Sequence, residues 1–179
     1  MQPEPDDSAI TAAVAGDDDA LAAVFRHWHP RVVAYLRARG AENPEDVASE
    51  VWLSVVRGLP RFRGGWAGFG GWLFTIARRR LVDQRRLPAV PAEPGADLEQ
   101  LAAPDDTPEA VGASLSHEAA LQRIAALPTD QAEVVLLRVV AGLDVATVAR
   151  MLGKSPGAVR VQQHRALRRL AAQGAEVTK

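Results

Sequence analysis

The residues best suited to chemistry in this sequence are arginines and aromatic rings that alternate along one segment. Residues 57–87 hold eight arginines, a single acid and, from Gly58 onward, six glycines, and five of the chain's nine aromatic residues lie between positions 62 and 74. Aromatic rings stack on unpaired bases, and guanidinium groups hold phosphates. The segment therefore predicts a loop and helix that bind opened DNA, with Arg61, Phe62, Arg63, Trp66, Phe69, Trp72, Arg78 and Arg79 as candidate contacts.

A hydrophobic core is the alternative role for some of these rings. For Trp72 and Phe74 the two roles are equally balanced. For Phe62, Trp66 and Phe69 the interleaved arginines favour contact with bases.

A second basic cluster follows a turn at Gly153-Lys154. Residues 144–152 predict a short helix, and Ser155-Pro156 predicts the cap and first position of a helix that reaches about residue 172. Two helices joined in this way are typical of the helix-turn-helix, whose second helix enters the major groove. The alternative is an ordinary hairpin with a basic outer face. The candidate DNA contacts are Lys154, Ser155, Arg160, Val161, His164, Arg165 and Arg168.

An acidic cluster begins the predicted helix 43–58, with Glu45, Asp46 and Glu50. Asp46 and Glu50 are four residues apart and share a helix face. Compensation of the helix dipole accounts for Glu45. Glu50 lies beyond the first turn, so it indicates contact with a basic protein partner.

Other chemistry has little support in the sequence. There is no cysteine, and the four histidines form no HExxH pair. Nucleophile-elbow and phosphate-loop motifs are also missing, so we expect no catalytic residue, no metal and no cofactor. The longest apolar runs are shorter than 18 residues, and the chain starts with an acidic, proline-rich stretch. We therefore expect a cytoplasmic protein that does not insert into membranes.

Helices must position these clusters, because apolar residues recur at three- and four-residue steps and no stretch alternates with period two. After a short leading segment near 7–15, the 179-residue sequence predicts helices near 17–39, 43–58, 71–86, 117–127, 129–141, 144–152 and 155–172. Residues 88–116 contain five prolines and no lysine or arginine, which predicts an extended acidic linker. The expected fold is all-α, with two small helical bundles, 1–87 and 117–179, on either side of that linker.

The ordered motifs resemble bacterial RNA polymerase sigma factors of the sigma-70 family, extracytoplasmic-function (ECF) group. Residues 43–53 resemble the polymerase-binding helix, and 59–62 with 71–83 resemble the part that melts and reads the −10 promoter element. Residues 127–143 resemble the start of region 4, and 155–166 resemble the helix that reads the −35 element. The likeness covers roughly 17–87 and 117–171.

The resemblance implies a non-catalytic subunit that binds core RNA polymerase and directs promoter-specific initiation. Glu45, Asp46 and Glu50 would face the β′ clamp, and the C-terminal bundle would meet the β flap. The loop 60–70 would hold a flipped base of the −10 element, and the acidic linker would pass through the RNA exit channel. Relatives commonly have an anti-sigma partner. Val161 stands where many relatives have a small polar residue, which favours contact with a thymine methyl group.

Two alternatives remain open at the level of sequence. A helix-turn-helix regulator would bind duplex DNA without RNA polymerase. A small DNA-processing enzyme would cleave DNA with a divalent metal, and the missing carboxylate cluster argues against it.

Overall fold

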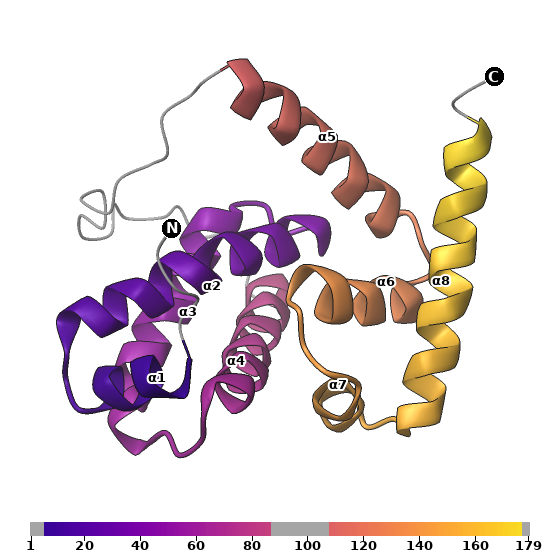
Figure 1. Cartoon of the computed structure of the whole chain (residues 1–179). Helices are drawn as coiled ribbons and strands as arrows, with labels where there is room; N and C mark the ends of the chain where they lie inside the picture. Colours follow the sequence, from indigo (N-terminus) through magenta and orange to yellow (C-terminus); the bar gives the residue numbers. More distant parts are fainter. Residues whose placement is uncertain (1–5, 87–107, 177–179) are drawn as a thin grey trace.

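The computed structural model describes residues 6–86 and 108–176, with side chains described for 6–84 and 117–173. Every regular element within those ranges is helical, which confirms the predicted all-α class (Figure 1). None of the helices described is long and apolar enough to span a bilayer.

The N-terminal half, residues 6–86, contains four α-helices and a short 3₁₀ turn. They are α1 (Asp7–Val14), α2 (Asp18–Ala38), α3 (Pro44–Gly58), η1 (Leu59–Arg61) and α4 (Trp66–Arg86). Helix α2 starts where the sequence predicts, because the Asp17 carboxylate accepts a hydrogen bond from the Ala20 backbone N–H at 2.8 Å. The apolar face of α2 then packs against α3 and α4.

Helix α4 begins at Trp66, whereas the apolar spacing predicts a start near residue 71. Glycines weaken a helix in isolation, but here two of them allow close packing. A Cβ atom at Gly70 would lie 2.8 Å from Leu143 Cδ2, and one at Gly71 would lie 2.7 Å from Thr147 Cγ2. Tertiary contacts therefore extend the helix through a stretch that propensity alone assigns to a loop.

The C-terminal half, residues 108–176, contains α5 (Pro108–Ala125), α6 (Thr129–Val135), the π-helical turn η2 (Leu136–Val140), α7 (Val145–Leu152) and α8 (Pro156–Glu176). Helix α5 starts nine residues before the predicted position 117, so the prediction of an extended linker as far as residue 116 is wrong at its end. Proline is well tolerated at the first position of a helix, and no proline follows it as far as residue 127. The remainder of that predicted linker, 88–107, lies outside the described residues.

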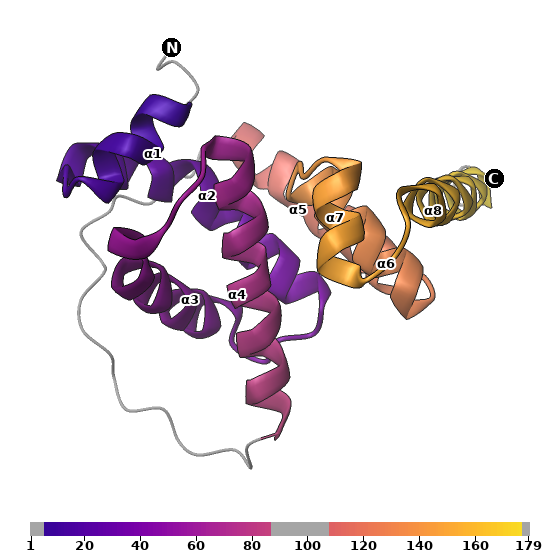
Figure 2. The same ribbon diagram turned by 90° about the horizontal axis from the view of Figure 1, so that it is seen from below.

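The two halves pack directly against each other. Helix α2 contacts α5 and η2, and α7 lies beside α4 (Figures 1 and 2). The buried side chains of both halves form one continuous apolar cluster, which includes Tyr35 and Leu36 on one side and Leu136 and Leu137 on the other. The helices that carry the predicted DNA contacts, α4 and α8, therefore share one hydrophobic core.

Candidate nucleic-acid interface

The predicted base-stacking rings lie together at the start of α4. The ring centroid of Phe62 is 5.0 Å from that of Trp72 and 5.7 Å from that of Phe69. Trp66 instead packs on Trp28, with centroids 5.3 Å apart. Phe62, Trp66 and Trp72 are half-buried, so part of each side chain stays at the surface.

Phe69 differs from the other rings because its exposed fraction is 0 %. It supports them from inside the core, and a base could reach it only if the ring left that position. Contact between Phe69 and DNA stays a prediction. Phe74, for which the sequence left core and DNA contact equally open, is also fully buried.

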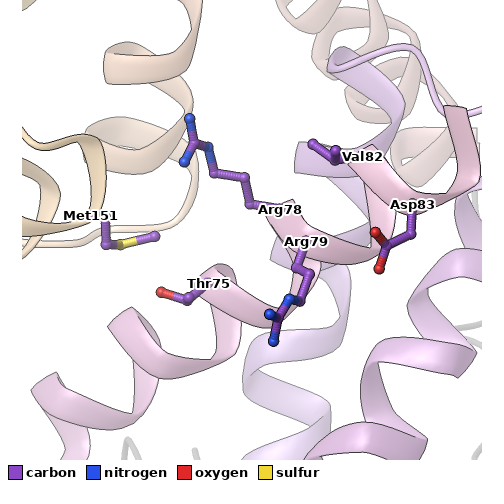
Figure 3. Close-up of a pocket in the computed structure, with 6 residues that line it drawn as sticks. All are labelled: Thr75, Arg78, Arg79, Val82, Asp83 and Met151. Carbon is purple, nitrogen blue, oxygen red and sulfur yellow. The ribbon is translucent and has the colours of Figure 1, made fainter. Parts of the chain in front are cut away.

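The predicted arginines around this cluster are exposed on the loop and on α4. The Arg63 guanidinium donates to the backbone carbonyls of Pro60 at 3.1 Å and Phe62 at 2.8 Å, which holds it against the loop. Arg78 and Arg79 line a pocket of about 290 Å³, completed by Thr75, Val82, Asp83 and Met151 (Figure 3). Figure 3 shows the Arg78 side chain reaching toward the C-terminal half. Met151 of α7 borders the pocket on the side opposite α4.

Arg78 has a partner that sequence reasoning missed. Its Nε lies 3.4 Å from a carboxylate oxygen of Glu133, which is 5 % exposed. The Arg39 guanidinium lies 2.9 Å from the other oxygen, and the Tyr35 hydroxyl donates to Glu133 at 2.8 Å. Burial, together with this neighbouring negative charge, raises the pKa of the Tyr35 phenol, which keeps it a donor. Glu133 is the one acid within the apolar stretch 132–137, and this position was the signal in the sequence for a buried carboxylate with partners.

The helix-turn-helix forms as predicted, from α7 and α8. The Asp144 carboxylate caps α7 by accepting from the Thr147 hydroxyl at 2.7 Å and from the Thr147 N–H at 2.9 Å, and these two bonds, the hydroxyl's first, hold the pKa of Asp144 below its ordinary value. Gly153 ends α7 with φ +63°, a value that favours glycine. The Ser155 hydroxyl accepts from the Ala158 N–H at 3.1 Å at the start of α8, which confirms its predicted capping role.

Helix α8 buries Val159 and Ala166 and turns its predicted DNA contacts outward. The Val161 side chain is 50 % exposed, which suits contact with a thymine methyl group. The exposed set on this helix is Arg160, Val161, His164, Arg165 and Arg168. Lys154 instead lies 3.0 Å from Asp130, and this contact lowers the pKa of that carboxyl.

The acidic face of α3 also carries exposed apolar side chains. Asp46 and Glu50 are exposed, and Leu53 and Val56 beside them are 53 % and 50 % exposed. Leu53 and Val56 were not among the predicted contacts, which on this helix were the acids alone. Glu50 makes one long ion pair, 3.8 Å from Arg80. An exposed face that is both acidic and apolar is suited to a protein partner.

Glu45 is more engaged than its neighbours. Its carboxylate lies 3.4 Å from His29 Nε2 and 3.9 Å from the Arg37 guanidinium. Burial lowers the pKa of His29, and the Glu45 charge opposes that shift in part.

No group of three or more histidines, cysteines or carboxylates that could hold a metal ion occurs among the residues of known placement, 6–86 and 108–176. The polar groups at these surfaces are hydrogen-bond donors and cations on α4 and α8, and acids on α3. They are suited to binding phosphates, bases and a protein surface.

Comparisons with known proteins agree on both halves. The family model for Sigma-70 region 2 matches residues 24–87, and the model for Sigma-70, region 4 matches residues 117–170. The ECF RNA polymerase sigma factor ShbA of Streptomyces griseus is 39 % identical over 178 residues, covering 91 % of this chain and 92 % of ShbA. SigD of Mycobacterium tuberculosis, also an ECF RNA polymerase sigma factor, is 37 % identical over 181 residues, covering 95 % of this chain and 84 % of SigD.

A solved structure shares the fold. CnrH, determined in complex with the cytosolic domain of CnrY, superposes with a TM-score of 0.65 at 20 % identity, over 96 % of this chain and 98 % of CnrH.

Proposed function

This chain belongs to the ECF group of the sigma-70 family and directs promoter-specific initiation by RNA polymerase, and from that premise we propose how its surfaces divide the task. The N-terminal half binds the polymerase clamp and opens the −10 element. The C-terminal half reads the −35 element. The proposed units are 1–87 and 117–179, and α5, which begins at residue 108, extends the second unit toward the N-terminus.

At the −10 element, the loop before α4 holds one unpaired base. Phe62, Trp66 and Trp72 supply ring surface, and Arg61 and Arg63 hold the neighbouring phosphates. Stacking contributes about 1–3 kcal/mol per base, which offsets the few kcal/mol needed to take a base out of the duplex. Arg78 and Arg79, farther along α4, lie against the adjoining duplex backbone.

At the −35 element, α8 enters the major groove with Arg160, Val161, His164 and Arg165 toward the bases. Arg168, nearer the end of the helix, and Lys154 and Ser155 at its start contact the backbone. The helix has a basic exposed face on a buried apolar one, as this docking requires.

At the polymerase, the α3 face of Asp46, Glu50, Leu53 and Val56 contacts the β′ clamp. Glu45 contributes less because its carboxylate already pairs with the Arg37 guanidinium and lies against His29. The C-terminal half contacts the β flap, and the acidic segment 88–107 runs toward the RNA exit channel.

Three further assignments follow from the family. An anti-sigma factor binds this chain, as the cytosolic domain of CnrY binds CnrH. The chain acts in the cytoplasm, where bacterial RNA polymerase acts. Catalysis belongs to the polymerase and not to this subunit.

The observation that carries the proposal is that both halves match sigma regions and both expose basic helix faces. If the chain were a regulator that binds duplex DNA without RNA polymerase, the half that matches region 2 would have no function. The test is transcription in vitro from a promoter library. We expect transcripts that need both this chain and core polymerase. If core polymerase with this chain starts only where core alone starts, the proposal is wrong.

A further inference from the structure

The loop before α4 has a contact partner that lies outside the region matched by the family model. The region 2 model begins at residue 24, and α1 (Asp7–Val14) precedes it. The Asp7 carboxylate accepts a hydrogen bond from the Trp66 backbone N–H at 2.6 Å. Helix α1 packs against η1 and α4 as well as α2 (Figures 1 and 2). The first residue of α4 is therefore held by a separate helix.

Gly65 explains why this bond comes from another helix. The Gly65 carbonyl accepts from the Phe69 N–H at 2.9 Å, which makes Gly65 the N-cap residue of α4. An N-cap residue usually offers a side-chain oxygen to the free N–H groups of the first turn, and glycine has none. Asp7 supplies that oxygen instead. A Cβ atom at Gly65 would lie 2.7 Å from the Asp7 Cγ, so a side chain there would push the carboxylate away.

The first turns of α4 need this support because their sequence disfavours a helix. Gly68, Gly70 and Gly71 all lie within residues 66–71, and glycine is a poor helix former. The helix that carries Asp7 is itself fixed, since Ile10 of α1 is 1 % exposed and belongs to the hydrophobic core. Buried packing therefore holds the capping carboxylate in place.

The capped residue, Trp66, is one whose ring we assign to the unpaired base. Its ring centroid lies 4.8 Å from that of His27 and 5.3 Å from that of Trp28. At the other end of the loop, the Phe62 ring lies against Gly64, whose φ of +155° favours glycine. Asp7 therefore fixes the backbone of a segment that joins two of the proposed stacking rings.

We propose that Asp7 is a positioning residue for promoter opening, because its carboxylate caps α4 from α1 and holds the loop 62–66 in the shape that receives the unpaired −10 base. The inference rests on the proposed role of this loop. Asp7 acts through Trp66 and not on DNA, since a carboxylate repels phosphate oxygens. Loss of the cap lets the glycine-rich first turn of α4 unwind. Fewer chains are then ready to stack a base, while closed binding through α8 is unchanged.

The test compares opening with binding, using the full chain with core polymerase on a promoter that the wild type opens. Permanganate reactivity measures opening, and a mobility shift at low temperature measures closed complexes. A helix cap shifts an equilibrium about fivefold, so we expect Asp7→Ala to lower the fraction of bound complexes that open by about that factor. Gly65→Ala should lower it similarly by displacing the carboxylate. Asp18→Ala is the matched control, because it removes an exposed first-turn carboxylate from α2.

Two rescue variants separate positioning from a general loss of stability. Asp7→Asn keeps an oxygen that can accept the Trp66 bond, and asparagine caps helices about as well as aspartate, so opening should stay near the wild-type level. In Asp7→Ala, the space left by the carboxylate admits a side chain at residue 65. Gly65 has no positive φ, so its backbone accepts serine. Adding Gly65→Ser to Asp7→Ala should therefore restore the cap and recover most of the opening.

Equal opening by wild type and Asp7→Ala, or a loss of opening and binding by the same factor, would overturn the positioning role. Failure of both Asp7→Asn and the double variant to restore opening would overturn it too. If core polymerase with the wild-type chain opens no promoter, the proposed function has failed. If it opens promoters and Asp7→Ala does so equally well, only the role of Asp7 is wrong.

Discussion

Replacing Phe69 with alanine tests two roles for this ring. Either every ring of the aromatic cluster binds DNA, or the exposed rings bind DNA and Phe69 belongs to the hydrophobic core beneath them. The Phe69 ring is 0 % exposed and packs among Trp28, Phe62 and Trp72, with ring centroids 6.4, 5.7 and 5.7 Å away. Its removal leaves a cavity that the rigid neighbouring rings cannot fill. We therefore expect Phe69→Ala to act first on folding.

The magnitude follows from the burial. Truncation of a fully buried phenylalanine costs about 3–5 kcal/mol of unfolding free energy. For a chain of this size, each kcal/mol lowers the melting temperature by roughly 2–4 °C. Thermal unfolding followed by circular dichroism should therefore show a drop of about 12 °C for Phe69→Ala. Phe62→Ala is the matched control, with a smaller drop because that ring is half-buried.

The opposite pattern would refute this reasoning. If Phe69→Ala melts within about 3 °C of the wild type and yet fails to form open promoter complexes, the ring serves DNA and not the core. The buried position described here would then belong to one conformation, and promoter binding would bring the ring out.

The remaining predictions concern the three other surfaces. Trp66→Ala should impair promoter opening more than promoter binding, because it removes a stacking surface worth about 1–3 kcal/mol; permanganate footprinting separates the two steps, and equal losses would contradict the role. Glu50→Arg should weaken binding to core polymerase in a pull-down and leave the melting temperature nearly unchanged, because its exposed pair with Arg80 contributes little; Glu42→Arg, at another exposed acid, should bind normally. Burial lowers the pKa of His29, so the unfolded chain binds more protons below about pH 6.5 and stability should decrease as the pH falls from 7 toward 5. Urea midpoints should show this loss reduced in His29→Gln, and an identical pH dependence in both proteins would refute it.

Features with local causes were predictable from the sequence. Asp17, Asp144 and Ser155 cap the helices that follow them, since a side-chain oxygen two or three residues before a free N–H is a local arrangement. The helix-turn-helix follows from one such cap and from Gly153. The exposed basic faces of α4 and α8 follow from charge spacing.

Features with long-range causes were not predictable. The first residue of α4, Trp66, donates its backbone N–H to the Asp7 carboxylate, 59 residues away, and Gly70 and Gly71 pack against Leu143 and Thr147, which are more distant still. The partner of Arg78 depends on a fold that brings Glu133 beside Tyr35, 98 residues apart in sequence. Periodicity and propensity describe neighbours along the chain and contain no information about such contacts.

The glycines of the segment 58–71 have a packing role in the structure that differs from the role the sequence suggests. In the sequence they suggest a loop that can splay around a base. In the structure, Gly58 leaves room for the Trp72 ring, and Gly70 and Gly71 let Leu143 and Thr147 approach α4. The surface of α4 that meets the C-terminal half also carries Arg78. The face of α4 that packs against the C-terminal half therefore includes both these glycines and an arginine that we propose as a DNA contact.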